Sequence, residues 1–238
     1  MTADVSDAVI HARRRTARWA GALYLGFILA SVAADQLGHL GLSESQEVRT
    51  AILDSEVPFR LGLAAAMGSA LLFVLAAWAL YVLLRPVNDS AALLLLTLNA
   101  IGVAVQIASY LPLLGALAGV DNAAQQPATV DLDQEAAVAV ATYQSGFASA
   151  QLFFSAWLFP LGWLVIRSGF LPRLLGWLLL LDGVAILVWF LQALTAPDYP
   201  AISYPAWAVS FVAEVALGLW LLIRGTGTGP APAPAVPR

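Results

Sequence analysis

The sequence predicts an all-α, polytopic membrane protein: a bundle of six transmembrane helices with both termini in the cytoplasm. Three observations predict this class. Of the 238 residues, 61% are hydrophobic and 11% are charged, whereas soluble globular chains carry about 25% charged residues. Six apolar segments each reach the length of about 20 residues that a bilayer crossing requires. Three of these segments close on an aromatic residue, three aliphatic residues and an arginine, at 81–85, 163–167 and 220–224.

The apolar segments set the domain organisation. We expect spans near 17–35, 59–84, 91–117, 137–166, 174–195 and 204–223. They form a single transmembrane domain, 17–224, which follows a cytoplasmic arm, 1–16. The tail, 225–238, is rich in Gly, Pro and Ala and is expected to be disordered. The first span also fits a secretory signal with a small-residue cleavage site at 31–33, but the sequence favours an uncleaved span.

The arginines predict the orientation of the bundle. All eleven basic residues are Arg. An N-terminus inside the cell places nine of them on the cytoplasmic side, in agreement with the positive-inside bias. An aromatic ring sits well at the headgroup level, so each of the three arginine endings indicates a helix that crosses from outside to inside. The nine are Arg13, Arg14, Arg15, Arg18, Arg85, Arg167, Arg173, Arg224 and Arg238.

The short cytoplasmic turns, 85–90 and 167–173, predict tight antiparallel helix pairs. In the second turn Gly169 suits a left-handed helix cap, and Pro172 suits the first turn of the next helix. Pro112 and Pro160 are expected to interrupt the third and fourth spans.

The first external loop predicts a short helix at the outer surface, over 43–56. Ser43 and Gln46 resemble a capping box, and the loop carries four residues that share one helical face: Val48, Ala51, Ile52 and Ser55. Further along the chain, Asp131 or Asp133 can cap an early start of the fourth span, which would then project beyond the bilayer.

The composition excludes several chemistries. No Cys is present, so the chain has no thiol nucleophile, disulfide or thiolate metal site. The two histidines, His11 and His39, fall outside the spans and cannot ligate haem within the membrane. We find no phosphate-binding Gly-Lys-Ser/Thr motif and no basic stripe for nucleic acid. The sequence predicts no metal, no cofactor and no nucleic-acid partner, and it favours a non-enzymatic role.

Asp182 and Glu214 are the two clear cases of ionisable residues inside spans, and such residues are by default functional candidates. Counted from the cytoplasmic helix ends, both lie about 12–15 Å deep, at the level of Asn99. Burial without a cation favours the neutral form of a carboxyl, so we expect at least one to be protonated at neutral pH. The three side chains can form a ligand, proton or cation site. The alternative is a helix-packing role, with the carboxyls bonded to neighbouring helices.

A second candidate is an outward-facing pocket. Arg60 opens the second span near the outer boundary, and Asp35 closes the first span at a similar height. The two form either a surface ion pair or, with Arg60 holding an anion, the mouth of a pocket. Other polar residues of the outer half that can line it are Gln106, Tyr110, Gln151 and Gln192.

Several stretches resemble the domain-of-unknown-function 4386 family of bacterial multispan membrane proteins. The most specific is the turn 167–176, Arg-Ser-Gly-Phe-Leu-Pro-Arg-Leu-Leu-Gly. The segments 18–24, 58–62 and 214–224 resemble the family as well. The resemblance covers roughly 16–224 and implies six helices, an uncleaved first span and a bacterial cell (inner) membrane location. Family histidines near Tyr143 and Trp157 have no counterpart in this chain, so no role passes to these positions.

The functional prediction is a non-enzymatic membrane module that binds or passes a small molecule, with Glu214, Asp182 and Arg60 as its principal residues. The alternative is a structural or partner-binding subunit. The lipid bilayer is the expected partner, with a small-molecule ligand, and neither substrate nor oligomeric state can be read from the sequence.

Overall fold

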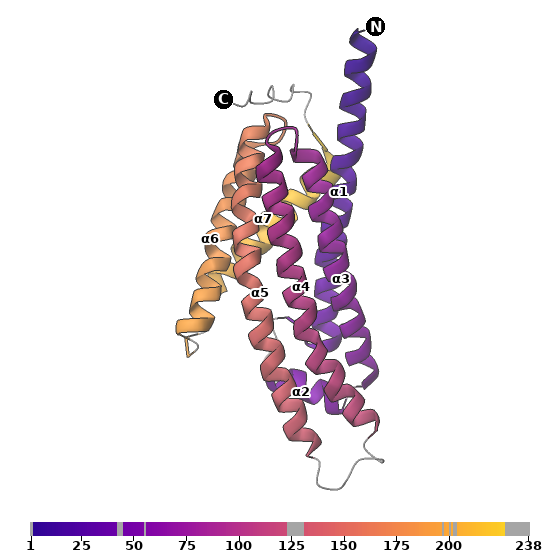
Figure 1. Cartoon of the computed structure of the whole chain (residues 1–238), viewed down its shortest axis with the longest axis vertical. Helices are drawn as coiled ribbons and strands as arrows, with labels where there is room; N and C mark the ends of the chain where they lie inside the picture. Colours follow the sequence, from indigo (N-terminus) through magenta and orange to yellow (C-terminus); the bar gives the residue numbers. More distant parts are fainter. Residues whose placement is uncertain are drawn as a thin grey trace. The chain divides into compact units, whose positions relative to one another are not determined.

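The computed structural model describes residues 2–41, 45–54, 56–122, 131–196, 198–199, 201 and 204–226. Its regular elements are helices (Figure 1): α1 (Thr2–Gly38), α2 (Ser45–Asp54), α3 (Glu56–Leu84), α4 (Asp89–Asp121), α5 (Leu132–Ser168), α6 (Arg173–Thr195) and α7 (Tyr204–Ile223). The predicted all-α class is therefore confirmed for the described residues.

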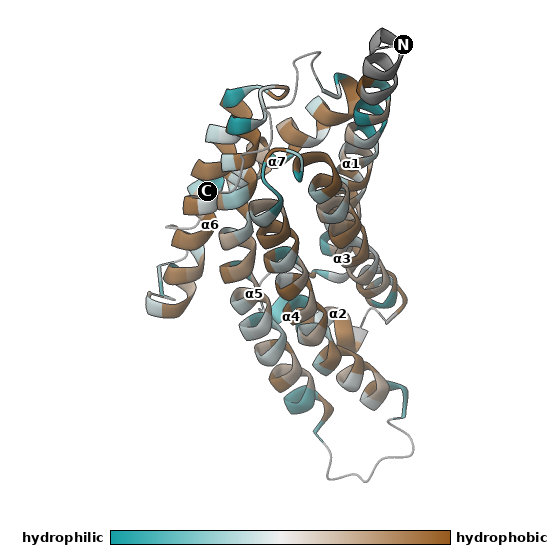
Figure 2. Ribbon diagram, turned by 45° about the horizontal axis from the view of Figure 1, so that its top comes forward, coloured by the Kyte–Doolittle hydropathy of each residue, from teal (hydrophilic) through white to brown (hydrophobic). Residues whose placement is uncertain are grey.

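Six of these helices are long and apolar enough to cross a membrane, over Ile10–Gly38, Val57–Leu84, Asp89–Asp121, Leu132–Ser168, Arg173–Thr195 and Tyr204–Ile223. Hydrophilic colour gathers mainly near helix ends, for example at the start of α5 (Figure 2). The chain is a multi-pass membrane protein whose apolar helices contact the lipid bilayer.

The start of α5 shows how polar residues lengthen a membrane helix. Asp131 Oδ1 accepts hydrogen bonds from the backbone N–H groups of Asp133 and Gln134, at 3.1 and 3.2 Å. This is an N-cap, so the predicted early start is confirmed with Asp131 as the capping residue. The 37 residues of α5 span about 55 Å, against a hydrocarbon core of about 30 Å.

The chain forms two compact units. The first comprises Met1–Gly26, Leu72–Gly102 and Gln151–Arg238, and the second comprises Phe27–Leu71 and Val103–Ala150. Four helices, α1, α3, α4 and α5, contribute a part to each unit. In contrast, α6 and α7 belong wholly to the first unit and α2 to the second.

In the second unit, α2 packs by the face that the sequence predicted. Val48, Ala51 and Ile52 are buried in a core that also contains residues of α1, α3, α4 and α5. Ser43 and Ser55 lie outside the described residues, so the capping box stays a prediction. A helix thus lies within the predicted range, where burial of this face offsets the entropy of ordering a short segment. Its place at the outer surface stays a prediction.

In the first unit, glycines allow helix backbones to touch. A Cβ on Gly21 would lie 2.5 Å from the backbone nitrogen of Leu222, so α1 and α7 are in backbone contact. A Cβ on Gly162 would lie 2.8 Å from the carbonyl oxygen of Gly176, which joins α5 to α6 in the same way. Small residues at such crossings are typical of membrane helix packing.

Two local predictions need correction. Pro112 and Pro160 lie inside α4 and α5, which continue through them. A spanning helix tolerates proline because its neighbours re-satisfy the freed backbone groups. Pro172 precedes α6 as its N-cap residue, with φ −63° and ψ 130°, and is not in the first turn. Gly169 has φ +70°, which confirms the left-handed conformation expected there.

Candidate functional site

Two membrane helices bring Asp182 and Glu214 together in the first unit, where α6 packs against α7. Asp182 is fully buried, and Glu214 is partly buried. Their carboxyls are close enough to interact electrostatically. Two carboxylates held together in a low-dielectric interior repel each other strongly, so this pairing demands a compensating proton or cation.

Hydroxyl groups are the other partners of this carboxyl pair. The Tyr24 hydroxyl of α1 interacts with the Glu214 carboxyl, and the Ser210 hydroxyl of α7 interacts with the Asp182 carboxyl. Neither Asp182 oxygen makes a hydrogen bond of good geometry within the described structure, so the Ser210 contact is a loose one. None of the groups that act most strongly on the two carboxyls is a cation.

Aromatic rings form one wall of this cluster. The Tyr24 ring stacks on Trp157 of α5, with centroids 6.3 Å apart and an interplanar angle of 19°. Phe73 of α3 meets Tyr24 and Trp157 edge-on, at 6.0 and 5.1 Å. All three rings are buried. The wall fixes the Tyr24 hydroxyl beside Glu214 and excludes water from that side, which strengthens electrostatic interactions in the cluster.

The helix register places Asn99 of α4 at the level of the aromatic wall. A Cβ on Gly102 would lie 2.6 Å from the Phe154 ring. Because α4 and α5 run antiparallel, Asn99 and Trp157 fall one turn beyond that contact on facing helices. Asn99 and Trp157 are both fully buried. Neither the Asn99 amide nor the Trp157 indole N–H has a hydrogen-bond partner among the described residues.

We call Tyr24, Asn99, Trp157, Asp182, Ser210 and Glu214 the polar layer. A buried polar group without a partner costs about 1–3 kcal/mol, and the layer holds several such atoms. The carboxyl and hydroxyl oxygens of such an arrangement can share a proton or coordinate a small cation. Sequence reasoning selected Asn99, Asp182 and Glu214. It missed Tyr24, Trp157 and Ser210, which look like ordinary packing residues of a span.

A structural hydrogen bond lies next to the layer. The Ser155 hydroxyl of α5 donates to the Gly183 carbonyl oxygen of α6 at 2.8 Å, in a fully buried position. It satisfies the hydroxyl across the helix contact and fixes α6 beside α5 at the residue that follows Asp182.

Arg60, the predicted outer residue, pairs with Asp121 of α4. One guanidinium nitrogen lies 2.5 Å from each carboxylate oxygen, and the two side chains are 42% and 37% exposed. Sequence reasoning proposed Asp35 as the partner. Asp35 lies close to Gly41, where a Cβ would come within 3.4 Å of its Oδ1. The Arg60–Asp35 pair stays a prediction.

A second ion pair ties α2 to α5. Arg49 Nε donates to Asp133 Oδ1 at 2.7 Å, and a second guanidinium nitrogen contacts Oδ2. The hydrogen bond with Asp133 raises the pKa of Arg49 above its ordinary value. Because the pKa of Arg49 is higher in the folded state, its ion pair stabilises the fold fully at any pH below the unfolded-state pKa. This stabilisation is lost only as the pH rises through the folded-state pKa. The guanidinium of this pair therefore stays charged at neutral pH.

The other predicted outer residues divide between the two units. Gln106 donates to the Tyr110 hydroxyl at 3.1 Å, and the Tyr110 ring stacks on Tyr143 at 5.8 Å. Asp35 interacts electrostatically with Tyr143, so it belongs to the same cluster of the second unit. Sequence reasoning did not select Tyr143, because nothing local sets it apart from packing aromatics.

Gln151 and Gln192 belong to the first unit, and both are largely buried. The Gln192 amide donates to the Ala196 carbonyl oxygen at 2.9 Å and closes the end of α6. A local capping role thus accounts for Gln192, and a pocket shared by all five outer residues stays a prediction.

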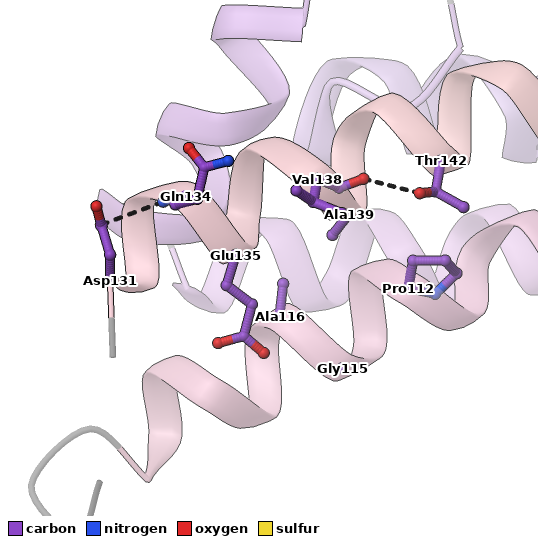
Figure 3. Close-up of a pocket in the computed structure, with 9 residues that line it drawn as sticks. All are labelled: Pro112, Gly115, Ala116, Asp131, Gln134, Glu135, Val138, Ala139 and Thr142. Carbon is purple, nitrogen blue, oxygen red and sulfur yellow. Dashed lines mark hydrogen bonds between the residues drawn. The ribbon is translucent and has the colours of Figure 1, made fainter. Parts of the chain in front are cut away.

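A cavity of about 450 Å³ lies between α4 and α5 in the second unit (Figure 3). Two of its polar side chains serve their own helix: Asp131 caps α5, and the Thr142 hydroxyl donates to the Val138 carbonyl oxygen at 2.8 Å. The Glu135 carboxylate lies against Gly119 of α4. We therefore do not assign it as the site. Its lining comprises Pro112, Gly115, Ala116, Asp131, Gln134, Glu135, Val138, Ala139 and Thr142.

No group of three His, Cys, Asp or Glu side chains suited to a metal ion occurs among the residues that the structure describes. A family model described as Domain of unknown function (DUF4386) matches residues 19–225, a range that includes every member of the polar layer. No curated protein and no solved structure matches the chain.

Proposed function

The chain belongs to the DUF4386 family, and from this premise and the polar layer we propose that it is a non-enzymatic membrane module that binds a proton or a small monovalent cation between Asp182 and Glu214. The family description assigns no activity that could be transferred, so the proposal rests on the residues of this chain.

The observation that carries the proposal is the pairing of two like charges. Asp182 and Glu214 interact with each other and with the hydroxyls of Ser210 and Tyr24. Within a membrane such a pair is stable when one carboxyl is neutral or when a cation lies between them. The Asn99 amide of the polar layer has no hydrogen-bond partner among the described residues. A small solute that moves with the proton or cation would supply this partner.

We place the protein in the bacterial cell membrane, with both termini in the cytoplasm and α2 at the outer surface. The positive-inside bias supports this orientation, because arginines flank the ends of α3, α5 and α7. In this orientation the arginine-bearing helix ends face the cytoplasm and the Arg60–Asp121 pair faces outward.

A helix-packing role is the second candidate. The Ser155–Gly183 hydrogen bond and the close backbone contacts at Gly21 and Gly162 favour a rigid helix assembly. In that case the carboxyls act as polar contacts between α6 and α7, and their amide analogues should replace them at little cost.

Glu214→Gln separates the two candidates. The Gln side chain is nearly isosteric but cannot bind a proton or neutralise a cation. The purified protein would be reconstituted in liposomes, and proton flux would be followed with an entrapped pH dye under a pH gradient, with Na⁺ or K⁺ as the exchange ion. We expect flux in the wild type and at least a tenfold loss in the variant.

The matched control is Glu135→Gln, which makes the same chemical change at an exposed residue of α5. It should keep the flux of the wild type. If Glu214→Gln folds, keeps its thermal stability and retains full flux, the packing role holds and the proposed function is wrong.

A further inference from the structure

The first unit carries a concentration of arginines that the polar layer does not use. They lie near the start of the apolar part of α1 (Ile10–Gly38) and at the ends of α5 and α7: Arg13, Arg14, Arg167 and Arg224. We call these four residues the arginine corner. No positively charged residue is needed there for the proposed function.

Two contacts bring these residues into one corner of the first unit. The Arg13 guanidinium lies over the Phe170 ring, 4.9 Å from its centroid, and Phe170 follows Arg167 in the α5–α6 turn. A Cβ on Gly225 would lie 3.6 Å from the Arg14 carbonyl oxygen, and Gly225 follows Arg224. The start of the apolar part of α1 therefore touches both the α5–α6 turn and the end of α7.

Stacking orients two of the guanidinium groups. Arg167 lies over Trp163 at 5.2 Å, and Arg224 lies over Trp220 at 4.7 Å. Both pairs have the i,i+4 spacing of the aromatic–arginine endings. A stacked guanidinium uses its flat face for the ring and keeps its in-plane N–H donors for a planar or tetrahedral anion, which it binds in a bidentate manner.

Arg14 adds an independent observation. Its Nε is buried and has no hydrogen-bond partner among the described residues. A buried charged donor without an acceptor is costly, so an anion that reaches this nitrogen would stabilise the corner. Among residues with described side chains, no acidic residue lies within one helical turn of Arg14, Arg167 or Arg224 along the chain.

The flanks of the corner are apolar. Trp163 is 38% exposed and Ile223 is 67% exposed, and both lie on spanning helices beside the arginines. A ligand that fills the site therefore has a phosphate end for the guanidinium groups and acyl chains for this apolar surface. From this geometry we propose that the arginine corner binds the phosphate headgroup of an anionic phospholipid.

The test compares lipids that differ in headgroup charge alone. The purified full chain would be titrated with phosphatidylglycerol or with phosphatidylcholine of the same acyl chains, and bound lipid would be counted by native mass spectrometry. We expect the wild type to retain phosphatidylglycerol preferentially. Equal retention of the two lipids by the wild type would overturn the proposal.

The variant Arg167→Gln/Arg224→Gln removes the two stacked guanidiniums. Each arginine near an anionic surface contributes about fivefold in affinity, so the pair should lower phosphatidylglycerol binding about thirtyfold. The matched control is Arg15→Gln/Arg85→Gln, which removes two exposed arginines outside the corner and should lower binding much less. Equal losses in the two variants would indicate diffuse attraction and not a site.

Inorganic phosphate distinguishes a lipid site from a site for a soluble anion. It offers the same oxygen acceptors without acyl chains, so we expect it not to displace phosphatidylglycerol at millimolar concentration. Displacement at that concentration would overturn the assignment to a lipid.

Discussion

The two units treat charge in opposite ways. In the second unit, ionised side chains lie at exposed or half-exposed positions and pair with opposite charges, as in Arg60–Asp121 and Arg49–Asp133. In the first unit, two carboxyl groups, those of Asp182 and Glu214, meet inside the membrane-spanning helices.

This difference separates architecture from a candidate site. Exposed pairs of opposite charge contribute about 0–1 kcal/mol each and need no further partner. A buried pair of like charges is stable when a third species, a proton or a cation, joins it. The burial of two carboxyls beside each other therefore identifies the polar layer as the candidate site.

The largest expected effect comes from separating the helices that hold the layer. Gly21→Leu places side-chain atoms against the α7 backbone, where a Cβ alone already lies 2.5 Å from Leu222 N. We expect a loss of about 3 kcal/mol or more in stability, measured as a lower thermal unfolding midpoint in detergent. Gly68→Leu is the control in the second unit, because a Cβ there meets nothing within 4 Å. Equal shifts in the two variants would refute the close α1–α7 contact.

The next effect tests the unpartnered amide. Asn99→Leu removes a buried donor and acceptor that have no partner among the described residues, so stability should rise by about 1–2 kcal/mol. Proton or cation flux in liposomes should fall at the same time, because the layer loses an oxygen ligand. A variant that is less stable and keeps full flux would show that the amide is a packing group.

A smaller loss should follow from Ser155→Ala. The change removes the hydroxyl that donates to the Gly183 carbonyl oxygen at 2.8 Å, at a cost of about 1 kcal/mol. Because the serine fixes α6 without touching the proposed ligand, unfolding should shift while flux per folded molecule is kept. Loss of flux without a stability change would instead place Ser155 in the site.

The smallest effect is expected in the second unit. Arg60→Gln breaks an ion pair whose members are 42% and 37% exposed, so stability should change by at most about 1 kcal/mol. The change should shrink further at high salt, as followed by thermal unfolding in low and high NaCl. A salt-independent loss of several kcal/mol would mean that this pair is not solvated, and the contrast between the units would fail.

Hydropathy predicted the spans well and the helix ends less well. The last span was expected at 204–223, and α7 is Tyr204–Ile223. The first was expected from 17, whereas α1 begins at Thr2. Hydropathy identifies the part of a helix that is apolar enough to lie in lipid. A helix can continue beyond that part where no Gly or Pro interrupts it, and residues 2–16 contain neither.

Part of the candidate site could also be read from the sequence. The constant rise per residue places Asp182 and Glu214 at one level, and the structure brings them together. Tyr24 could not be selected, since an aromatic residue in a span has no pattern of its own. The pairing of Arg60 with Asp121, 61 residues away, depends on the tertiary fold and leaves no local signal.

Infrared difference spectroscopy of the carboxyl stretch tests the central claim most directly. Wild type would be compared with Asp182→Asn/Glu214→Gln across pH and with added Na⁺ or K⁺. We expect a protonated-carboxyl band in the wild type that falls as pH rises or as the bound cation replaces the proton, and that is missing from the variant. A band that stays constant across pH and salt, or its absence throughout because both carboxyls are ionised, would contradict a proton- or cation-binding pair.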